Sequence, residues 1–294
     1  MGETVGSVRT LRRFPVKSML GEQPGSVEIG TSGIVGDRAW GLLDVETGKV
    51  ASAKHPRLWA SLLRLRAEYV DGPDPGGDVR IHLGDGTVVH SNDDDVDARL
   101  SEAAERTVRL VASAPAGAVY DEEWPDVADI APAGFVDATN TGRSADGNPL
   151  SSLPVGMLAP GTFQDVAPLT LMTTASLRAA RALHADGDWD DRRFRSTLLL
   201  ETDGDGFREQ DWLGRRLRIG EVEIEVAAPT PRCVMVTLAQ QDLPADTGVL
   251  RTLARHNRVD VLGSGRFACL GVYATVVRPG RVSTGDPVTL AETT

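Results

Sequence analysis

The sequence contains very little cysteine, since only Cys233 and Cys269 occur among its 294 residues. Two cysteines are too few for a disulfide framework, for an all-thiolate zinc site or for an iron–sulfur cluster. Any chemistry that needs a soft metal ligand must therefore depend on a single thiolate.

Long apolar segments and an excess of positive charge are also missing. No run approaches the ~18 apolar residues that cross a bilayer, and the N-terminus has no apolar signal region, so we expect a cytoplasmic protein without membrane contact. The 31 Lys and Arg residues against 42 Asp and Glu give a formal net charge of −11. This balance excludes a general polyanion binder, and we expect no nucleic-acid partner.

Three common nucleotide-binding and hydrolase motifs are absent as well. There is no G-x-G-x-x-G after a strand, no phosphate-binding loop with Gly-Lys-Ser/Thr and no G-x-S-x-G. The chain thus lacks the usual marks of nicotinamide-binding folds, nucleotide triphosphatases and serine hydrolases.

The apolar pattern favours a mainly β protein with a few helices, of the α+β class. Short β-prone runs broken by glycine fill residues 26–53, and Val222, Ile224 and Val226 alternate with glutamates. Helical spacing predicts helices at about 95–105, from Thr173 or Thr174 to near Gly187, and at about 247–257. Residues 58–70 predict a short helical turn that leads into a strand. Strands and helices do not alternate, so we expect two packed β-barrel-like parts and not a doubly wound sheet. Residues 112–168 show little periodicity, which predicts a long irregular connection.

Cys233 is the more reactive candidate of the two cysteines. It follows a predicted strand and has Arg232 as its neighbour, and a guanidinium can lower the pKa of a thiol and favour a thiolate that acts as nucleophile or metal ligand. The alternative is a buried core cysteine, because free cysteines are often buried. For Cys269, between Phe267 and Leu270, we expect the core position.

Several basic residues lie beside turns and strand ends despite the acidic composition. Such residues can bind phosphate or carboxylate through bidentate hydrogen bonds. The alternative is that each is a surface residue paired with one of the abundant acids. The residues concerned are Lys17, Arg38, Arg193, Arg195 and Arg232.

Five short motifs in order resemble the MOSC family, named after the C-terminal domain of molybdenum cofactor sulfurase. The motifs are FPVKS (14–18), GDRAW (36–40), the Thr-Ala-Ser helix start (174–176), RRFR (192–195) and TPRC (230–233), followed by a Gly-Val-Tyr strand and a terminal Gly-Asp. The resemblance covers about residues 10–292. It implies an N-terminal MOSC β-barrel domain at 5–110 and a MOSC domain at 111–294. Family members with this arrangement include the amidoxime-reducing enzymes, which hold molybdopterin-bound molybdenum through one cysteine.

The resemblance also implies a set of site residues. Cys233 matches the molybdenum ligand and catalytic position of the family. The positions that match contacts to the pterin or its phosphate are Lys17, Ser18, Arg38, Thr174, Ser176, Arg195, Thr230 and Arg232. Thr197 occupies the place of the family's cofactor-facing asparagine, and it lacks the amide donor and the carbonyl acceptor. The resemblance therefore implies the molybdenum cofactor less firmly than it implies the fold.

Three functions are compatible with these observations. The first is a molybdenum-dependent oxidoreductase that reduces N-hydroxylated small molecules, for which a separate reductase would supply electrons because the chain has no flavin, nicotinamide or iron–sulfur signature. The second is a sulfur-transfer or cofactor-carrier protein that uses Cys233. The third is a cofactor-free MOSC protein with another catalytic or binding role. The sequence does not identify the substrate.

Overall fold

The structure is a computed structural model that describes residues 2–74 and 76–291. It confirms the expected class, because strands dominate and helices are few and short. The helices are α1 (Pro56–Trp59), α2 (Val96–Ala104), α3 (Ala133–Thr139), α4 (Thr174–Leu183) and α5 (Thr247–His256), with 3₁₀ turns η1 (Ala60–Arg64), η2 (Asp191–Phe194), η3 (Arg208–Trp212) and η4 (Val234–Thr237). No helix in the described ranges is both long and apolar enough to span a bilayer.

Side-chain caps explain where two of the predicted helices begin. Ser176 N donates to Thr173 Oγ1 at the start of α4, and Gly248 N donates to Asp246 Oδ1 at the start of α5. Each bond satisfies a backbone donor that the first turn leaves free. Leu250, Leu253 and Ala254 are buried on one side of α5, as their spacing predicted.

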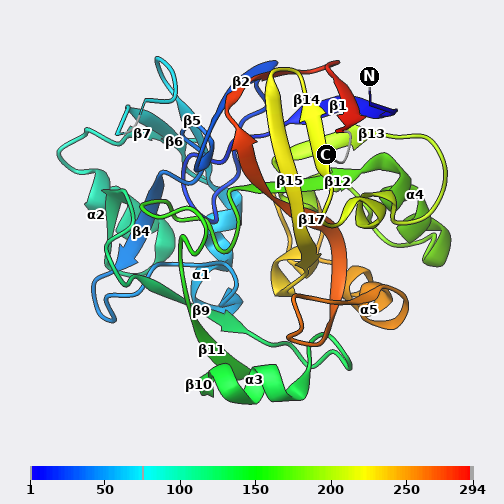
Figure 1. Cartoon of the computed structure of the whole chain (residues 1–294). Coiled ribbons are helices and arrows are strands. Elements are labelled where there is room, and N and C mark those ends of the chain that lie inside the picture. The colour runs from blue at the N-terminus through cyan, green and yellow to red at the C-terminus, as the bar shows by residue number, and fades with distance from the viewer. Residues whose placement is uncertain (1, 75, 292–294) are drawn as a thin grey trace.

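A closed barrel forms the larger domain (Figure 1). Its seven strands follow the order β12-β13-β1-β19-β14-β15-β17, and β17 closes the ring by pairing with β12. The strands are β1 (Thr4–Leu11), β12 (Leu169–Thr173), β13 (Leu198–Glu201), β14 (Arg216–Ile219), β15 (Val222–Pro231), β17 (Arg266–Arg278) and β19 (Pro287–Leu290), and β16 (Arg258–Asp260) extends β17 outside the ring.

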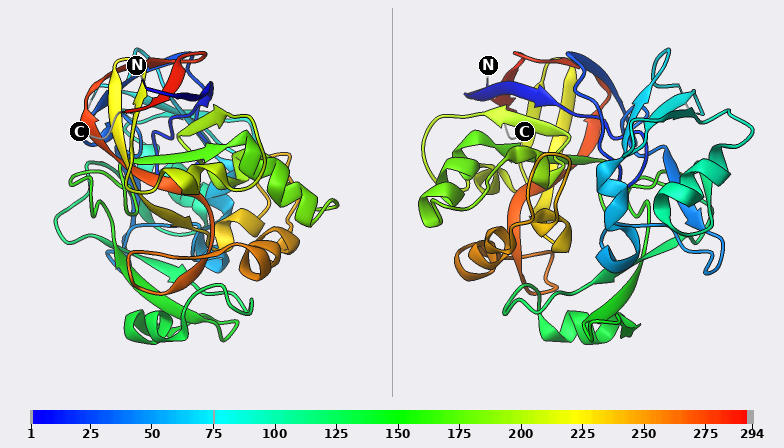
Figure 2. Two further views of the ribbon diagram at one scale, coloured as in Figure 1. Left: turned by 45° about the vertical axis from the view of Figure 1, so that its right-hand side comes forward. Right: turned by 180° about the vertical axis from the view of Figure 1, so that it is seen from behind.

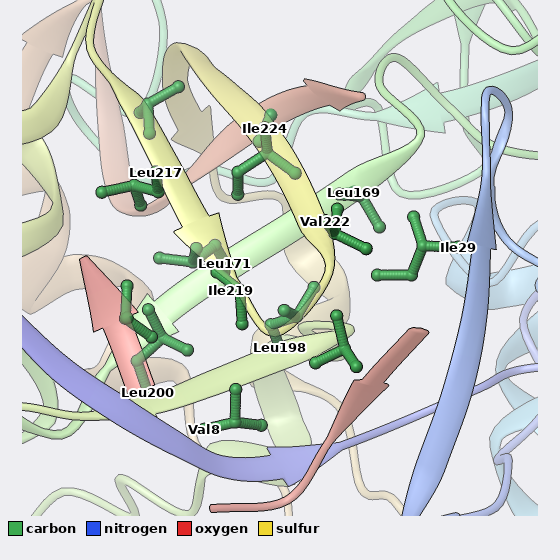
Figure 3. Packing of buried hydrophobic residues seen from close by; sticks show 14 of the residues in the cluster. Val8, Ile29, Leu169, Leu171, Leu198, Leu200, Leu217, Ile219, Val222 and Ile224 are labelled. Atoms are coloured by element: carbon green, nitrogen blue, oxygen red, sulfur yellow. The ribbon is translucent and has the colours of Figure 1, made fainter. Parts of the chain in front are cut away.

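Apolar side chains fill the barrel. Leu171 from β12, Leu198 from β13 and Leu217 from β14 are fully buried and lie inside the ring of strands (Figure 3). Val222, Ile224 and Val226 are buried as well, whereas the glutamates between them are only partly buried, so the predicted alternation along this strand is confirmed. Each such side chain contributes ~1.5–3 kcal/mol when fully buried.

The N-terminal domain consists of small sheets around a second apolar core (Figure 2, right). Its strands are β4 (Trp40–Asp44) paired with β8 (Val108–Ala112), and β5 (Arg66–Tyr69), β6 (Val79–His82) and β7 (Val88–His90) in a meander. Isolated bridges from Val16 to Trp40 and from Leu20 to Arg66 connect these sheets through the loop after β1. This loop therefore crosses from the barrel, which contains β1, into the N-terminal domain.

A strand near the C-terminus also connects the barrel with the N-terminal part of the chain. β2 (Ser26–Gly30) pairs with β3 (Gly33–Ile34) and with β18 (Gly280–Ser283), which follows β17. The C-terminal segment, predicted as two strands, forms three, because Gly280 and the Ser283–Asp286 turn break it twice. The interleaving fixes the N-terminal domain against the barrel edge.

The prediction of a long irregular connection at 112–168 is wrong for much of that segment. β9 (Val119–Glu123), β10 (Asn140–Arg143) and β11 (Pro149–Pro154) form a sheet that α3 covers (Figure 1). The ring of Phe135 in α3 packs edge-on against Trp124 and Phe267, with centroids 5.9 and 5.2 Å apart. α3 has no fully buried residue, so its sequence carries no apolar stripe that reveals a helix.

Candidate functional site

A cleft lies where the N-terminal domain meets the edge of the barrel. It brings together seven of the predicted site residues, from positions as distant as 17 and 233 in the sequence. The residues that line it are Lys17, Ser18, Arg38, Ser52, Lys54, Gln164, Asp165, Val166, Ala167, Thr170, Arg193, Phe194, Arg195, Thr230, Pro231, Arg232, Cys233, Met235, Val236 and Tyr273. We call this set the cleft.

Three of the predicted residues reach the cleft through an uncommon backbone conformation. Ser18, Arg38 and Arg195 have φ values of 65°, 50° and 52°, in the left-handed region that residues other than glycine rarely adopt. Backbone strain of this kind is concentrated at functional sites, where the surrounding structure maintains it. Ser18 Oγ accepts a hydrogen bond from Ala53 N at 3.0 Å, which fixes its loop against the segment that carries Lys54.

Arg38 and Arg195 approach the same aromatic ring. The guanidinium carbons lie 4.7 and 4.2 Å from the centroid of Phe14, and Arg38 Nη1 also pairs with Asp37 at 2.5 Å. Arg195 Nη2 donates to Met19 O at 2.7 Å, whereas its buried Nη1 has no partner among the described residues. Burial and the nearby Arg38 lower the pKa of Arg195 to about 9.

Three further buried polar atoms of the cleft lack partners in the described part of the chain. Arg232 donates from Nε to Leu270 O at 2.7 Å and from Nη1 to Phe194 O at 2.9 Å, but its Nη2 has no acceptor within the described part of the chain. The same holds for Thr230 Oγ1 and for Nε of Arg193, whose Nη2 pairs with Asp188. A buried donor without an acceptor costs about 1–3 kcal/mol, so these atoms are suited to a polar ligand.

The other cations of the cleft are paired inside the protein. Asp165 forms ion pairs with Lys17 and with Lys54, whose Nζ also donates to Glu122 Oε2 at 2.9 Å. Burial opposes ionisation of Asp165, but the two lysines lower the pKa of this carboxyl overall. Burial lowers the pKa of Lys17, whereas Asp165 and Glu122 outweigh burial at Lys54 and raise its pKa.

Cys233 follows the end of β15 and begins η4 at the wall of the cleft. Burial raises the pKa of its thiol to about 11. The lowered pKa expected from the neighbouring Arg232 is therefore wrong, because burial disfavours the charged thiolate more than nearby positive charge favours it. Cys269 is fully buried in an apolar cluster, which confirms the core position expected for it.

The structure does not bring Thr174, Ser176 and Thr197 to the cleft. Thr174 Oγ1 donates to Glu201 at 3.1 Å, and Ser176 Oγ donates to Glu209. Thr197 Oγ1 donates to the carbonyl of Thr170 at 2.9 Å and accepts from the amide of Thr170 at 3.0 Å. The three hydroxyls thus form hydrogen bonds inside the protein.

Sequence reasoning missed Lys54, Gln164 and Asp165. Lys54 stands in a short polar turn, and the other two lie in the segment that was interpreted as an irregular connection. The functional tendency of long connections was the available signal for Gln164 and Asp165. In the described ranges, no group of three or more His, Cys, Asp or Glu side chains could hold a metal ion, so a metal in the cleft would rest on Cys233 and on ligands outside the protein.

Family models match most of the chain. The model of the MOSC N-terminal beta barrel domain matches residues 5–108, and the model of the MOSC domain matches residues 160–289. Neither range includes residues 109–159, which carry β9, β10, β11 and α3.

Curated relatives match over a shorter stretch. Mitochondrial amidoxime reducing component 2 of Homo sapiens is 30% identical over 138 residues, which are 43% of this chain and 38% of that protein. Molybdenum cofactor sulfurase of Anopheles gambiae is 33% identical over 125 residues, 39% of this chain and 15% of that protein. The chain thus spans well under half the length of both relatives. The crystal structure of the YUAD protein from Bacillus subtilis aligns over 100% of both chains with a TM-score of 0.46 and 10% identity.

The two family models cover the motifs that carry the resemblance, from FPVKS at 14–18 to TPRC at 230–233, in the order in which they stand. The chain belongs to the MOSC domain family, with a MOSC N-terminal beta barrel domain ahead of its MOSC domain.

Proposed function

We propose that the protein is an oxidoreductase that holds the molybdenum cofactor in the cleft and reduces N-hydroxylated small molecules. The observation that carries the proposal is that Arg195 Nη1, Arg232 Nη2 and Thr230 Oγ1, each buried and without a hydrogen-bond partner among the described residues, belong to the cleft that also contains Cys233. Two guanidinium donors and a hydroxyl match the oxygens of a phosphate, and a thiolate is a soft metal ligand. The relationship to an amidoxime reducing component supports the same reaction class.

The residues of the cleft divide into two groups in this proposal. Cys233 would hold the molybdenum after its thiol loses a proton, which the nearby positive charge of Lys54 favours. Arg195, Arg232 and Thr230 would bind the phosphate. When bound, the cofactor would supply the two-electron chemistry that no side chain of the cleft provides.

Asp165 would orient the substrate. Its carboxylate is held ionised between Lys17 and Lys54 and is partly accessible from the cleft. An ionised carboxylate accepts hydrogen bonds only, so it can receive one from the O–H or N–H of an N-hydroxylated amidine or amine. This contact would place the N–O bond in the cleft beside Cys233.

The net reaction converts an N–OH group, two electrons and two protons into N–H and water. We propose that a separate reductase supplies the electrons, because the sequence has no flavin or nicotinamide motif and only two cysteines.

The test is to express the chain in a host that makes the cofactor, and to measure molybdenum content and amidoxime reduction. We expect about one molybdenum per chain, turnover with a reduced viologen, and none with NADH or NADPH alone in a preparation free of other reductases. Molybdenum-free protein from such a host would contradict the proposal. Turnover with a nicotinamide alone would contradict the need for a separate donor.

A sulfur-transfer or carrier role is the second candidate, which the similarity to a molybdenum cofactor sulfurase favours. In this role Cys233 would carry a persulfide or pass the cofactor on. Trapping of a persulfide at Cys233 after incubation with a sulfur donor tests it, with Cys233→Ser as the control. A protein that holds molybdenum tightly through dialysis and forms no persulfide would exclude it.

A further inference from the structure

We propose that Glu209 is a positioning residue for the anion-binding group of the cleft, by which we mean Arg195, Arg232 and Thr230. Glu209 acts on Arg232 through the backbone of Gly271. The inference rests on the proposed function in one respect, namely that Arg232 binds an anionic group. It gives a role to the Thr-Ala-Ser helix start, whose hydroxyls do not reach the cleft.

Glu209 is a fully buried acid in η3. Its Oε2 accepts hydrogen bonds from Thr173 Oγ1 at 2.6 Å and from Ser176 Oγ. Its Oε1 accepts one from Gly271 N at 2.9 Å. Burial raises the pKa of Glu209, whereas the hydrogen bonds from Ser176, Thr173 and the Gly271 amide oppose this shift because they stabilise the carboxylate.

The amide that Glu209 binds belongs to a β-bulge. Along β15 and β17, Pro229 pairs with Val272 and Pro231 pairs with Cys269, so β17 has one more residue than β15 between these pairs. Gly271 lies in this bulge with φ +80°. Bulges interrupt the ladder and redirect neighbouring side chains, and they are frequent beside active sites. Glu209 thus satisfies an amide where the regular ladder is broken.

The bulge is also the surface against which Arg232 packs. A Cβ atom on Gly271 would lie 3.0 Å from Arg232 Nη2 and 2.7 Å from Leu171 O, so only glycine fits here. Arg232 Nε donates to the carbonyl of Leu270, the other residue of the bulge. The position of Leu270 and Gly271 therefore determines where the unpartnered Nη2 of Arg232 lies.

These contacts form one chain from α4 to the cleft: Thr173 and Ser176 hold Glu209, Glu209 holds the Gly271 amide, and the bulge holds Arg232. Burial lowers the pKa of Arg232, and the nearby Glu209 carboxylate opposes part of this shift. Loss of the carboxylate leaves the Gly271 amide unpaired and frees the bulge to relax. The guanidinium then loses its fixed direction, and the anion-binding group weakens.

The experiment measures binding of inorganic phosphate by calorimetry to chain from a host that cannot make the cofactor. We expect Glu209→Ala to raise the Kd for phosphate at least tenfold, and Glu209→Gln at most threefold because its carbonyl still accepts from Gly271. Glu201→Gln is the matched control, since Glu201 also accepts from a hydroxyl of α4 but has no contact with the bulge. Hydrogen exchange of the 266–273 segment should accelerate in Glu209→Ala only.

A double-mutant cycle separates positioning from general destabilisation. If Glu209 acts through Arg232, then Arg232→Ala and the double variant with Glu209→Ala should have the same Kd within twofold. Additive effects, or a folded Glu209→Ala that binds phosphate as the wild type does, would overturn the proposal.

If Glu209→Ala does not fold, Ser176→Ala is the variant to measure. We expect it to bind phosphate more weakly than the wild type, and unchanged binding would overturn the inference. Wild-type protein that binds no phosphate would overturn it too, whereas missing molybdenum would overturn the proposed function alone.

Discussion

The barrel interior and the cleft are built from the same strands but have opposite composition. Along β15, Val222, Ile224 and Val226 point into the barrel, whereas Thr230 and the residues after the strand, Arg232 and Cys233, belong to the cleft. The side chains that pack together inside the barrel form a large cluster of buried apolar residues. The cleft contains cations at close range and buried atoms without partners. Stability and function are thus separated along single strands.

The difference has an energetic basis. Buried apolar side chains of the barrel each stabilise the fold. Unpaired donors and neighbouring guanidiniums in the cleft cost free energy, and the fold maintains them because the barrel is stable. Substitutions in the barrel should therefore change stability, and substitutions in the cleft should change ligand binding.

The two cysteines provide the strongest test of this separation. Cys233→Ser should remove essentially all bound molybdenum with little change in Tm, because a hydroxyl replaces the soft ligand at a partly accessible site. Cys269→Ser should keep the metal and lower stability by about 1–3 kcal/mol, because it buries a hydroxyl in an apolar cluster. Metal analysis and thermal unfolding measure both. Full metal occupancy in Cys233→Ser would break the comparison.

A cavity in the barrel should produce the largest loss of stability. Leu171→Ala removes a fully buried side chain of β12 and should cost about 2–5 kcal/mol in the free energy of unfolding. Leu262→Ala is the matched control, since Leu262 is 75% exposed, and it should change stability by at most about 0.5 kcal/mol. Urea unfolding measures both. Folded Leu171→Ala should bind molybdenum as the wild type does, and selective loss of the metal would show that barrel and cleft are coupled.

The pH dependence of thiol alkylation sharpens the comparison. Burial raises the pKa of Cys233 to about 11 and that of Cys269 to about 12, so both thiols are protonated at neutral pH. Only the thiolate reacts, and the rate at Cys233 should rise about tenfold per pH unit from pH 8 to 10 without a plateau. Cys269, fully buried, should not react in the native state. Iodoacetamide labelling followed by peptide mass spectrometry tests this, and a plateau near pH 7 would mean that Cys233 has a lowered pKa.

Much of the fold could be predicted from local patterns. The alternation at Val222, Ile224 and Val226 and the spacing on α5 follow from periods that a single element imposes. Helix α3 was missed because its Phe135 packs against rings outside the helix, Trp124 and Phe267, and the helix has no apolar stripe of its own.

The site was predictable only to the level of residue identity. The resemblance singled out Arg195 and Arg232, and the structure brings both to the cleft. It could not distinguish a residue that lines the cleft from one that supports the wall, such as Ser176, because both belong to the same short motifs. Lys54 and Asp165 face each other only after the two domains pack, and no local pattern reports such a pairing.

The smallest expected effect concerns Thr197, which replaces the family's asparagine. Its hydroxyl is 1% exposed and bonds with both the amide and the carbonyl of Thr170. An asparagine has one acceptor and one donor at similar reach and can make the same two bonds. Thr197→Asn should therefore change the free energy of unfolding by less than about 1 kcal/mol and leave molybdenum content unchanged.

Thr197→Val, which removes both bonds at nearly constant shape, should cost about 1–3 kcal/mol and is the control. Higher molybdenum content in Thr197→Asn would mean that the side chain at 197 reaches the cofactor, and the boundary of the cleft would have to include it.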